Sequence, residues 1–335
     1  MPGLGAKAYV SLKEEISYGT FVISPTTRDV FARVVTDETE DNENTFESPA
    51  LGSRTVSQMY PGERAVDAPI EFEVGFEGVL PWLLKHVCGG YDFNANSPVA
   101  SANTHLFNPK QDLPLGFSME IGVGGVPDDQ AVFRYPGTKI SSLELSLEQG
   151  KIMTCKVAMM PRDEDINGTS GYPQLQAPTF AALKPIKFWY FAGLTVAGSV
   201  VSKVRSFKFK IENDLERRFN LALLTDEPYP GSKRKVTLEA VIEFNNLTHY
   251  NKYKNATDGT FALTISSGTD QIVTGAQSYT LGFAGTNSRI TAGRPKQTDA
   301  GILTMPLNCQ LYHPSAAEFQ ITLVNGQATC GSEIL

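Results

Sequence analysis

The chain has 335 residues, about two average domains at roughly 150 residues each. Hydrophobic residues make up 41% and charged residues 19%, so there is enough apolar material for a core and too little charge for a disordered protein. The 29 glycines and 20 prolines exclude a long coiled coil and favour many short elements joined by turns. A formal net charge of −7 argues against a surface that holds nucleic acid by neutralising phosphates.

Alternation of apolar and polar side chains, the pattern of half-buried strands, is the main signal along the chain. In residues 70–76, Glu71 and Glu73 occupy polar positions between apolar ones. In residues 236–244, Glu239 and Glu243 do the same. Two further segments alternate in this way, 143–147 and 207–211. The pattern predicts a mainly β protein.

Helical signals are few and short. Residues 78–87 predict one helix, with Pro81 near its start and Gly89 after its end. Residues 245–254 predict a second, with Asn245 as its N-cap. Each predicted helix therefore follows one of the alternating strands.

An internal repeat is the most informative feature of the sequence. Tyr60-Pro61-Gly62 and Tyr229-Pro230-Gly231 stand 169 positions apart, and each is followed by basic residues, an alternating strand and a short helix. Repeats of this length predict two copies of one domain rather than a solenoid. The predicted division is an N-terminal arm at 1–29, a first domain at 30–166, a connector at 167–199 and a second domain at 200–335. The alternative is coincidence, because strand-to-helix transitions are common in β proteins.

An acidic run lies between candidate strands near the N-terminus. It contains five carboxylates within eight residues, namely Asp37, Glu38, Glu40, Asp41 and Glu43. One interpretation is a solvated loop. The other is an acidic surface that repels nucleic acid or meets a basic partner.

The sequence offers little that points to catalysis, a cofactor or a metal. The four histidines are scattered, and no nucleophile elbow, zinc-protease or phosphate-binding motif is present. His86 and Cys88 lack a second pair of ligands, so a metal site there is disfavoured. Trp82 and Trp189 lie in apolar segments, which favours core packing over sugar stacking. We expect no enzyme, no cofactor and, because no apolar run approaches roughly 18 residues, no membrane span.

Several segments resemble the tail tube proteins of long-tailed bacteriophages. The N-terminal part, Gly5-Ala6-Lys7-Ala8-Tyr9 followed by Glu14-Glu15 and Tyr18-Gly19-Thr20, is similar to the arm of these proteins. Residues 203–216 resemble their strand that ends in an Asn-containing turn, and the segment from Pro230 through the helix near Tyr250 is similarly placed. The resemblance covers most of the chain, and the order of the elements carries it.

The resemblance implies a fold of two tandem tail-tube-like β-sandwich or half-barrel domains, each with one short flanking α-helix. It implies a structural virion protein that polymerises into stacked rings, with three two-domain chains in a pseudo-sixfold ring favoured over a hexamer. Its partners would be other copies of itself, the tape measure protein and tail-terminator or tail-tip proteins. The protein would belong to the virion tail, assembled in the host cytoplasm. The alternative is a non-catalytic β-sandwich of a phage fibre or baseplate, or a carbohydrate-binding protein.

A tube that conducts double-stranded DNA should let it pass without specific binding, because each phosphate contact would slow it. An acidic wall repels DNA over a Debye length of about 8–10 Å. We therefore expect Glu71, Glu73, Glu239 and Glu243 to line the lumen. We expect the acidic run from Asp37 to Glu43 to lie between rings or in the lumen.

Overall fold

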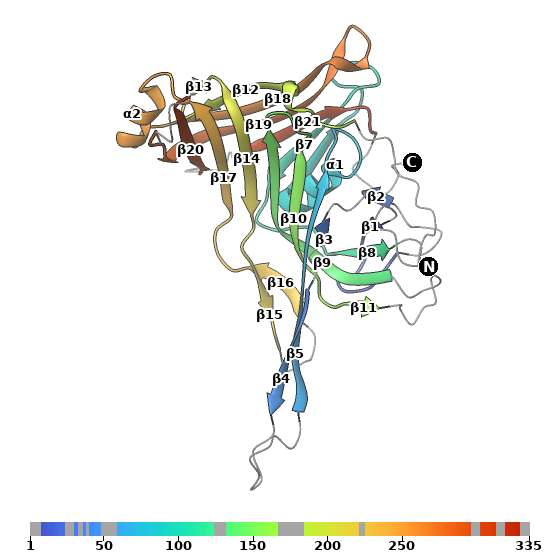
Figure 1. Ribbon diagram of the computed structural model, residues 1–335. Helices are drawn as coiled ribbons and strands as arrows, with labels where there is room; N and C mark the ends of the chain where they lie inside the picture. The colour runs from blue at the N-terminus through green and yellow to red at the C-terminus, as the bar shows by residue number, and fades with distance from the viewer. Residues whose placement is uncertain are drawn as a thin grey trace.

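The protein is a mainly β structure with two short helices in the part of the chain that the structure describes (Figure 1). The computed structural model describes residues 8–23, 30–32, 36–37, 40–47, 59–123, 132–166, 184–220, 225–295, 302–312 and 319–328. The predicted mainly-β class is confirmed.

The first half of the chain supplies eleven strands and one helix among the described residues. They are β1 (Ala8–Glu14), β2 (Val30–Ala32), β3 (Thr36–Asp37), β4 (Glu40–Glu47), β5 (Met59–Glu73), α1 (Leu80–Cys88), β6 (Gly89–Asn94), β7 (Asn103–Pro109), β8 (Phe117–Val123), β9 (Val132–Glu148), β10 (Thr154–Met160) and β11 (Asp165–Ile166).

The second half begins with a 3₁₀ turn, η3 (Phe188–Tyr190), and continues as strands with one helix. They are β12 (Phe191–Val196), β13 (Ser199–Val201), β14 (Val204–Glu212), β15 (Leu215–Arg218), β16 (Asp226–Pro230), β17 (Lys235–Glu243), α2 (Thr248–Lys254), β18 (Asp258–Val273), β19 (Gln277–Ala292), β20 (Thr304–Leu311) and β21 (Gln320–Asn325).

One antiparallel sheet, here called the main sheet, runs through both halves in the order β5–β10–β9–β14–β17–β20. The halves meet where β9 pairs with β14, from Glu148 opposite Ser206 to Ser142 opposite Glu212. Leu145 and Phe209 face each other across this seam and are fully buried. The seam therefore lies over the core and joins the halves by both backbone bonds and packing.

Two long strands each connect strands of the main sheet with strands outside it. The first part of β9 pairs with β8, which pairs with β1, while its last part pairs with β14. In the same way β19 pairs with β20 near its end and with β21 near its start. Strands that change sheets make the corners of orthogonally packed β structures. Strand β21 also pairs with β7, which joins the two halves a second time.

Helix α1 is buried against the core along nearly its whole length. Its Pro81 occupies the first turn, where a backbone N–H would have no partner within the helix, so proline costs no hydrogen bond there. Gly89 ends it with φ +88°, a left-handed conformation that favours glycine. The helix predicted at 78–87 is confirmed. Helix α2 is also confirmed, but the Oδ1 of Asn246, not Asn245, accepts the Thr248 N–H at 2.9 Å.

The repeat is offset by one residue between its turn and its strand. Gly62 and Gly231 are 169 positions apart, whereas Phe76 and Phe244, which come just before the helices, are 168 apart. One residue reverses the facing of a strand. A spacing of 169 would align Ile70, which is buried, with Glu239, which is exposed. The strands of the two copies therefore correspond at a spacing of 168, not 169.

Described parts of the predicted arm and connector are strands of the sheets. Residues 8–14 form β1, which lies between β8 and β2. Residues 191–196 form β12, which pairs with β18. The predicted domain boundaries at 30, 167 and 200 stay a prediction.

Asn213 is the buried polar centre at the end of the β9–β14 seam. Its Nδ2 donates to the carbonyls of Val87 in α1 and Ile140 in β9, at 3.0 and 3.2 Å. Its Oδ1 accepts from Arg234 Nε at 2.8 Å, and Arg234 also donates to the Lys110 carbonyl. One amide therefore ties the helix of the first half to strands of both halves.

Replacing this amide should destabilise the whole chain. Asn213→Ala removes the amide that donates to two carbonyls and accepts from Arg234 Nε, all in a buried position, so we expect the free energy of unfolding to fall by about 2–3 kcal/mol. Urea denaturation measures the change. The control Asn220→Ala removes an exposed amide and should cost about 0.5 kcal/mol or less. Equal losses in the two variants would contradict the role assigned to Asn213.

Glu14, at the end of β1, is bonded to helix α1. His86 Nε2 donates to Glu14 Oε1 at 3.3 Å, and Lys85 Nζ forms an ion pair with the same oxygen. The hydrogen bond from His86 is the largest cause, and together with Lys85 it lowers the pKa of Glu14 to about 2. Burial lowers the pKa of His86, so the histidine acts as a neutral donor.

The depressed pKa makes the contribution of Glu14 pH-dependent. Because its folded pKa lies below the usual 4.5, the ionised carboxylate stabilises the fold above that value and loses its effect as pH falls toward 2. Glu14→Gln should therefore lower stability at neutral pH by about 1 kcal/mol, allowing for the partly exposed pair. Denaturation from pH 7 to pH 2 should show the difference from wild type vanish. A difference that is independent of pH would contradict this account.

Candidate functional site

The four glutamates predicted to line a lumen lie on one face of the main sheet. Residues opposite each other on neighbouring strands point to the same side. Glu73, Thr154, Ser146, Lys208 and Glu239 form one such row across β5, β10, β9, β14 and β17. Glu71 is in the next row, and Glu243 is four residues beyond Glu239 on β17. The sheet therefore brings together carboxylates from both halves, on the side away from the core.

Lysines share this face, and the prediction of an acidic lining did not include them. Glu71, Lys156, Glu144 and Lys210 are opposite one another across four strands. Lys208 Nζ lies 3.8 Å from Glu144 Oε1. These side chains border a groove of about 560 Å³. The signal was present in the sequence, because Lys208 and Lys210 occupy the polar positions of an alternating strand.

Glu243 lies at the end of the face and is held by two cations. Arg205 Nη2 lies 3.1 Å and Lys203 Nζ 3.3 Å from its carboxylate oxygens. These hydrogen bonds hold the pKa of Glu243 below its usual value. Beside them is a second groove of about 450 Å³, with Phe188 and Phe191 in its wall. The carboxylate therefore forms part of a mixed apolar and charged rim.

Where the structure describes the acidic run, most of it lies in a strand of a projecting hairpin rather than in a loop. Glu40, Asp41 and Glu43 belong to β4, which pairs with β5 from Asp67 to Met59. Asp37 belongs to β3, and Glu38 lies outside the described residues. Figure 1 shows this hairpin extending from the lower end of the main sheet, beside the shorter hairpin β15–β16.

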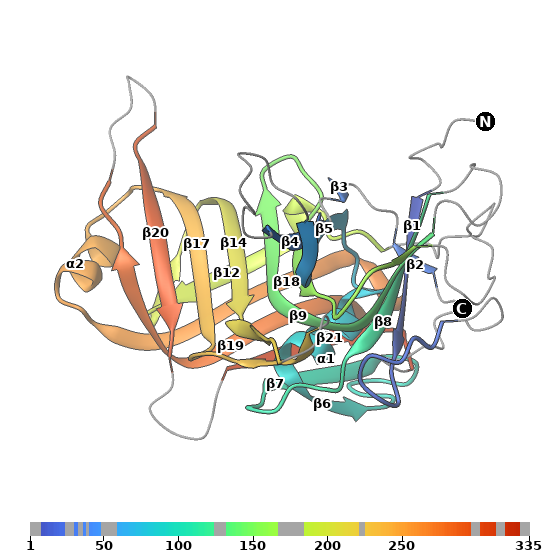
Figure 2. The same cartoon turned by 90° about the horizontal axis from the view of Figure 1, so that it is seen from below.

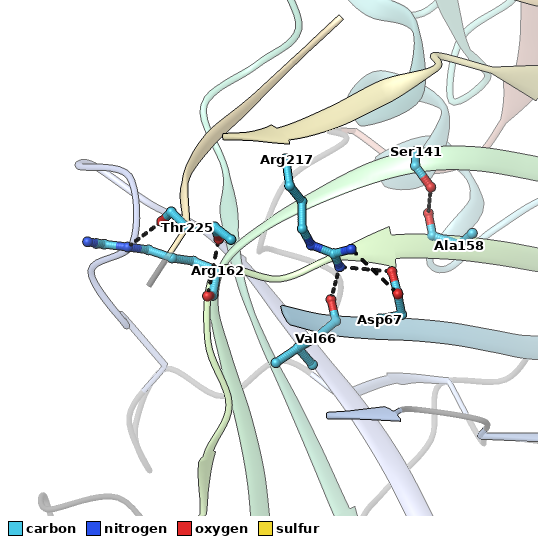
Figure 3. Close-up of polar contacts among 7 residues, drawn as sticks. All are labelled: Val66, Asp67, Ser141, Ala158, Arg162, Arg217 and Thr225. Carbon is cyan, nitrogen blue, oxygen red and sulfur yellow. Dashed lines mark hydrogen bonds and ion pairs between the residues drawn. The ribbon is translucent and has the colours of Figure 1, made fainter. Parts of the chain in front are cut away.

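The two hairpins are bonded to each other and to the body of the protein (Figure 3). The Arg217 guanidinium on β15 donates to the Asp67 carboxylate at 2.8 Å and to the Val66 carbonyl. Arg162 Nε donates to the Thr225 carbonyl at 3.2 Å. Sequence reasoning missed these contacts because Arg217 and Asp67 are 150 positions apart.

The main sheet ends in two unlike edges. At one side β5 pairs with the two-residue β3 and with β4. At the other, no described strand pairs with the outer side of β20 over residues 304–307. Figure 2 shows β20, β17 and β14 side by side, with α2 beyond β20. Two apolar side chains near these elements are exposed: Ile302, two residues before β20, is 63% exposed, and Leu247, directly before α2, is 55% exposed.

The tryptophans differ from each other. Trp82 is buried in α1, as expected, and packs on His86 with ring centroids 3.9 Å apart. Trp189 is 62% exposed, so its predicted core packing was wrong. It sits in the one-turn η3, which points its ring outward, and Lys187 Nζ lies 5.3 Å from the ring centre.

The described residues contain no group of three or more His, Cys, Asp or Glu side chains that could hold a metal. His86 bonds to Glu14, and His105 lies 2.9 Å from Asn325 Oδ1. Burial raises the pKa of the Cys155 thiol, which makes it a weak nucleophile. Among the described helices, none has the length and hydropathy to cross a membrane.

One of two comparisons with known proteins supports this picture of a structural β protein. A search of curated proteins gives no match. The sequence model of a family described as "Phage tail tube protein" matches residues 5–310, nearly the whole chain, which confirms the resemblance seen in the sequence. The chain belongs to the phage tail tube protein family, structural components of the virion tail.

Proposed function

We propose that this protein polymerises into stacked rings, and that these form the phage tail tube through which DNA is ejected. The observation that carries the proposal is the main sheet with its two unlike edges. A sheet edge presents unpaired N–H and C=O groups that favour pairing with another chain. The β20 edge of one copy and the β3–β5 edge of the next are available for such a contact.

Unlike edges make a head-to-tail contact, which closes a ring when the rotation per subunit divides a full turn. Pro306 lies in β20, and proline is tolerated in edge strands because it lacks the N–H that a central position needs. The exposed Ile302 and Leu247 add apolar surface beside that edge. Ring closure would bury both the backbone groups and these side chains.

We assign the contact between successive rings of the tube to the paired hairpins β4–β5 and β15–β16. Both project from the same end of the main sheet, and Arg217 holds them together. The acidic residues Glu40, Asp41 and Glu43 belong to this projection, so we place them at the contact between rings.

A ring of three chains is favoured over a ring of six. Each half of the chain presents the same succession of a projecting hairpin, a strand of the main sheet and a short helix: β4, β5 and α1, then β15–β16, β17 and α2. Two such units per chain give three chains a pseudo-sixfold ring. The face that bears Glu71, Glu73, Glu239 and Glu243 would line the lumen. Tape measure and tail-terminator or tail-tip proteins are the expected partners, with assembly in the host cytoplasm and no catalysis.

The purified chain should form hollow rings or tubes at high concentration. Negative-stain electron microscopy reveals them, and mass measurement of an isolated ring should give three times the 36.5 kDa chain mass. Six times that mass would contradict the trimer. Monodisperse monomers that bind glycans, with Trp189 as a stacking surface, would contradict the tube and favour the carbohydrate-binding alternative.

An apolar side chain beside the β20 edge tests the lateral contact. Ile302→Asp places a charge where ring closure would bury an apolar side chain, so we expect a folded monomer that forms no rings. The exposed position in the single chain should leave the melting temperature nearly unchanged. Electron microscopy and circular dichroism measure the two effects. The control Ile302→Val keeps an apolar side chain and should form rings; rings of Ile302→Asp as abundant as wild type would overturn this placement.

A further inference from the structure

We propose that the polar face of the main sheet is a neutralised contact surface for duplex DNA, on which Glu144 and its neighbouring carboxylates mask Lys156, Lys208 and Lys210 from phosphate. The proposal rests on the proposed function in one respect, namely that this face lines the lumen. It differs from the expectation of a purely acidic wall, because lysines lie among the glutamates.

Glu144 is the centre of the arrangement. It lies on β9, directly opposite Lys156 on β10 and directly opposite Lys210 on β14. Lys208, one step along β14 on the same face, has its Nζ 3.8 Å from Glu144 Oε1. Three lysines therefore surround a single carboxylate at the seam between the two halves.

Each lysine also has a second carboxylate nearby, on the next strand for Lys156 and Lys208 and on the same strand for Lys210. Lys156 is opposite Glu71 on β5, and Lys208 is opposite Glu239 on β17. Lys210 Nζ lies 2.5 Å from Glu212 Oε1. The row of Glu71, Lys156, Glu144 and Lys210 alternates in sign across four strands, and opposite charges on neighbouring strands attract.

This alternation suits a surface that must neither grip nor strongly repel DNA. An unpaired lysine that meets a phosphate releases counterions and binds, and several such contacts would hold the duplex. A lysine whose charge is balanced by carboxylates on both sides presents a short dipole, whose field decays within the Debye length of about 8–10 Å. The groove of about 560 Å³ between these side chains is open to a passing backbone.

The pairs contribute little to folding, which separates the proposed role from a structural one. The Lys208 side chain is 53% exposed and that of Glu144 is 28% exposed. Ion pairs at such positions contribute about 0–1 kcal/mol each. Removing the carboxylates should therefore change DNA affinity far more than it changes stability.

The test is DNA binding by the full purified chain before assembly. In the variant Glu71→Gln/Glu144→Gln/Glu239→Gln, Lys156 and Lys208 lose the carboxylates opposite them. Fluorescence anisotropy with a short labelled duplex should then show binding that wild type lacks. Two new phosphate contacts predict a slope of log affinity against log salt of about −1.8, which is roughly a tenfold loss from 50 to 200 mM salt.

A matched control makes the same change of net charge elsewhere. Asp92→Asn/Asp112→Asn/Glu216→Gln removes three carboxylates away from this face and should leave DNA binding as in wild type. Adding Lys156→Gln and Lys208→Gln to the first variant should abolish its binding. Equal binding by wild type and the first variant, or by the control and the first variant, would overturn the proposal. Melting curves verify that each variant is folded.

This outcome is independent of tube formation. Rings seen by microscopy together with no gain of DNA binding would leave the proposed function standing and reject the masking. A gain of DNA binding without rings would support the masking and reject the proposed function.

Discussion

The pairing of β9 with β14 is the constraint on which the rest of the structure depends. It joins a strand of the first half to the first main-sheet strand of the second, over seven pairs of residues from Glu148–Ser206 to Ser142–Glu212. Because register fixes facing, this one alignment places Leu145 and Phe209 in the core and Glu144 and Lys210 on the polar side. Asn213 then closes the end of the seam with bonds to α1, β9 and Arg234.

The same pairing determines which strands lie at the two edges of the main sheet. With the halves joined through β9 and β14, β5 with its partners β3 and β4 lies at one side of the main sheet. At the other side lies β20, whose residues 308–311 pair with β19 and whose residues 304–307 have no partner on the outer side among the described strands. These edges come from different halves of the chain, so the ring contact proposed above would join two copies head to tail.

Local features of the fold could be predicted from the sequence, while the long-range ones could not. Alternation places Glu71 and Glu239 on polar faces, and Pro81 with Gly89 brackets a real helix. No periodic sequence pattern indicates the β9–β14 register or the Arg217–Asp67 bond, because the residues that pair are far apart in the chain. The expected burial of Trp189 was wrong because its apolar sequence neighbours predict a core position, whereas the ring, in a single 3₁₀ turn, is exposed.

The sequence indicates which charged residues of the candidate site lie on polar faces, but not which charges lie opposite one another. Carboxylates on alternating strands are visible one strand at a time, but charge balance is a property of rows that cross strands. Glu144 belongs to no conspicuous run in the sequence, yet the register surrounds it with Lys156, Lys208 and Lys210. Exposed ion pairs add too little stability to explain such an arrangement by folding alone. Under the proposal that this face meets duplex DNA, such a row would keep single lysines from binding phosphate, because the spacing of opposite charges governs the field a few ångströms away.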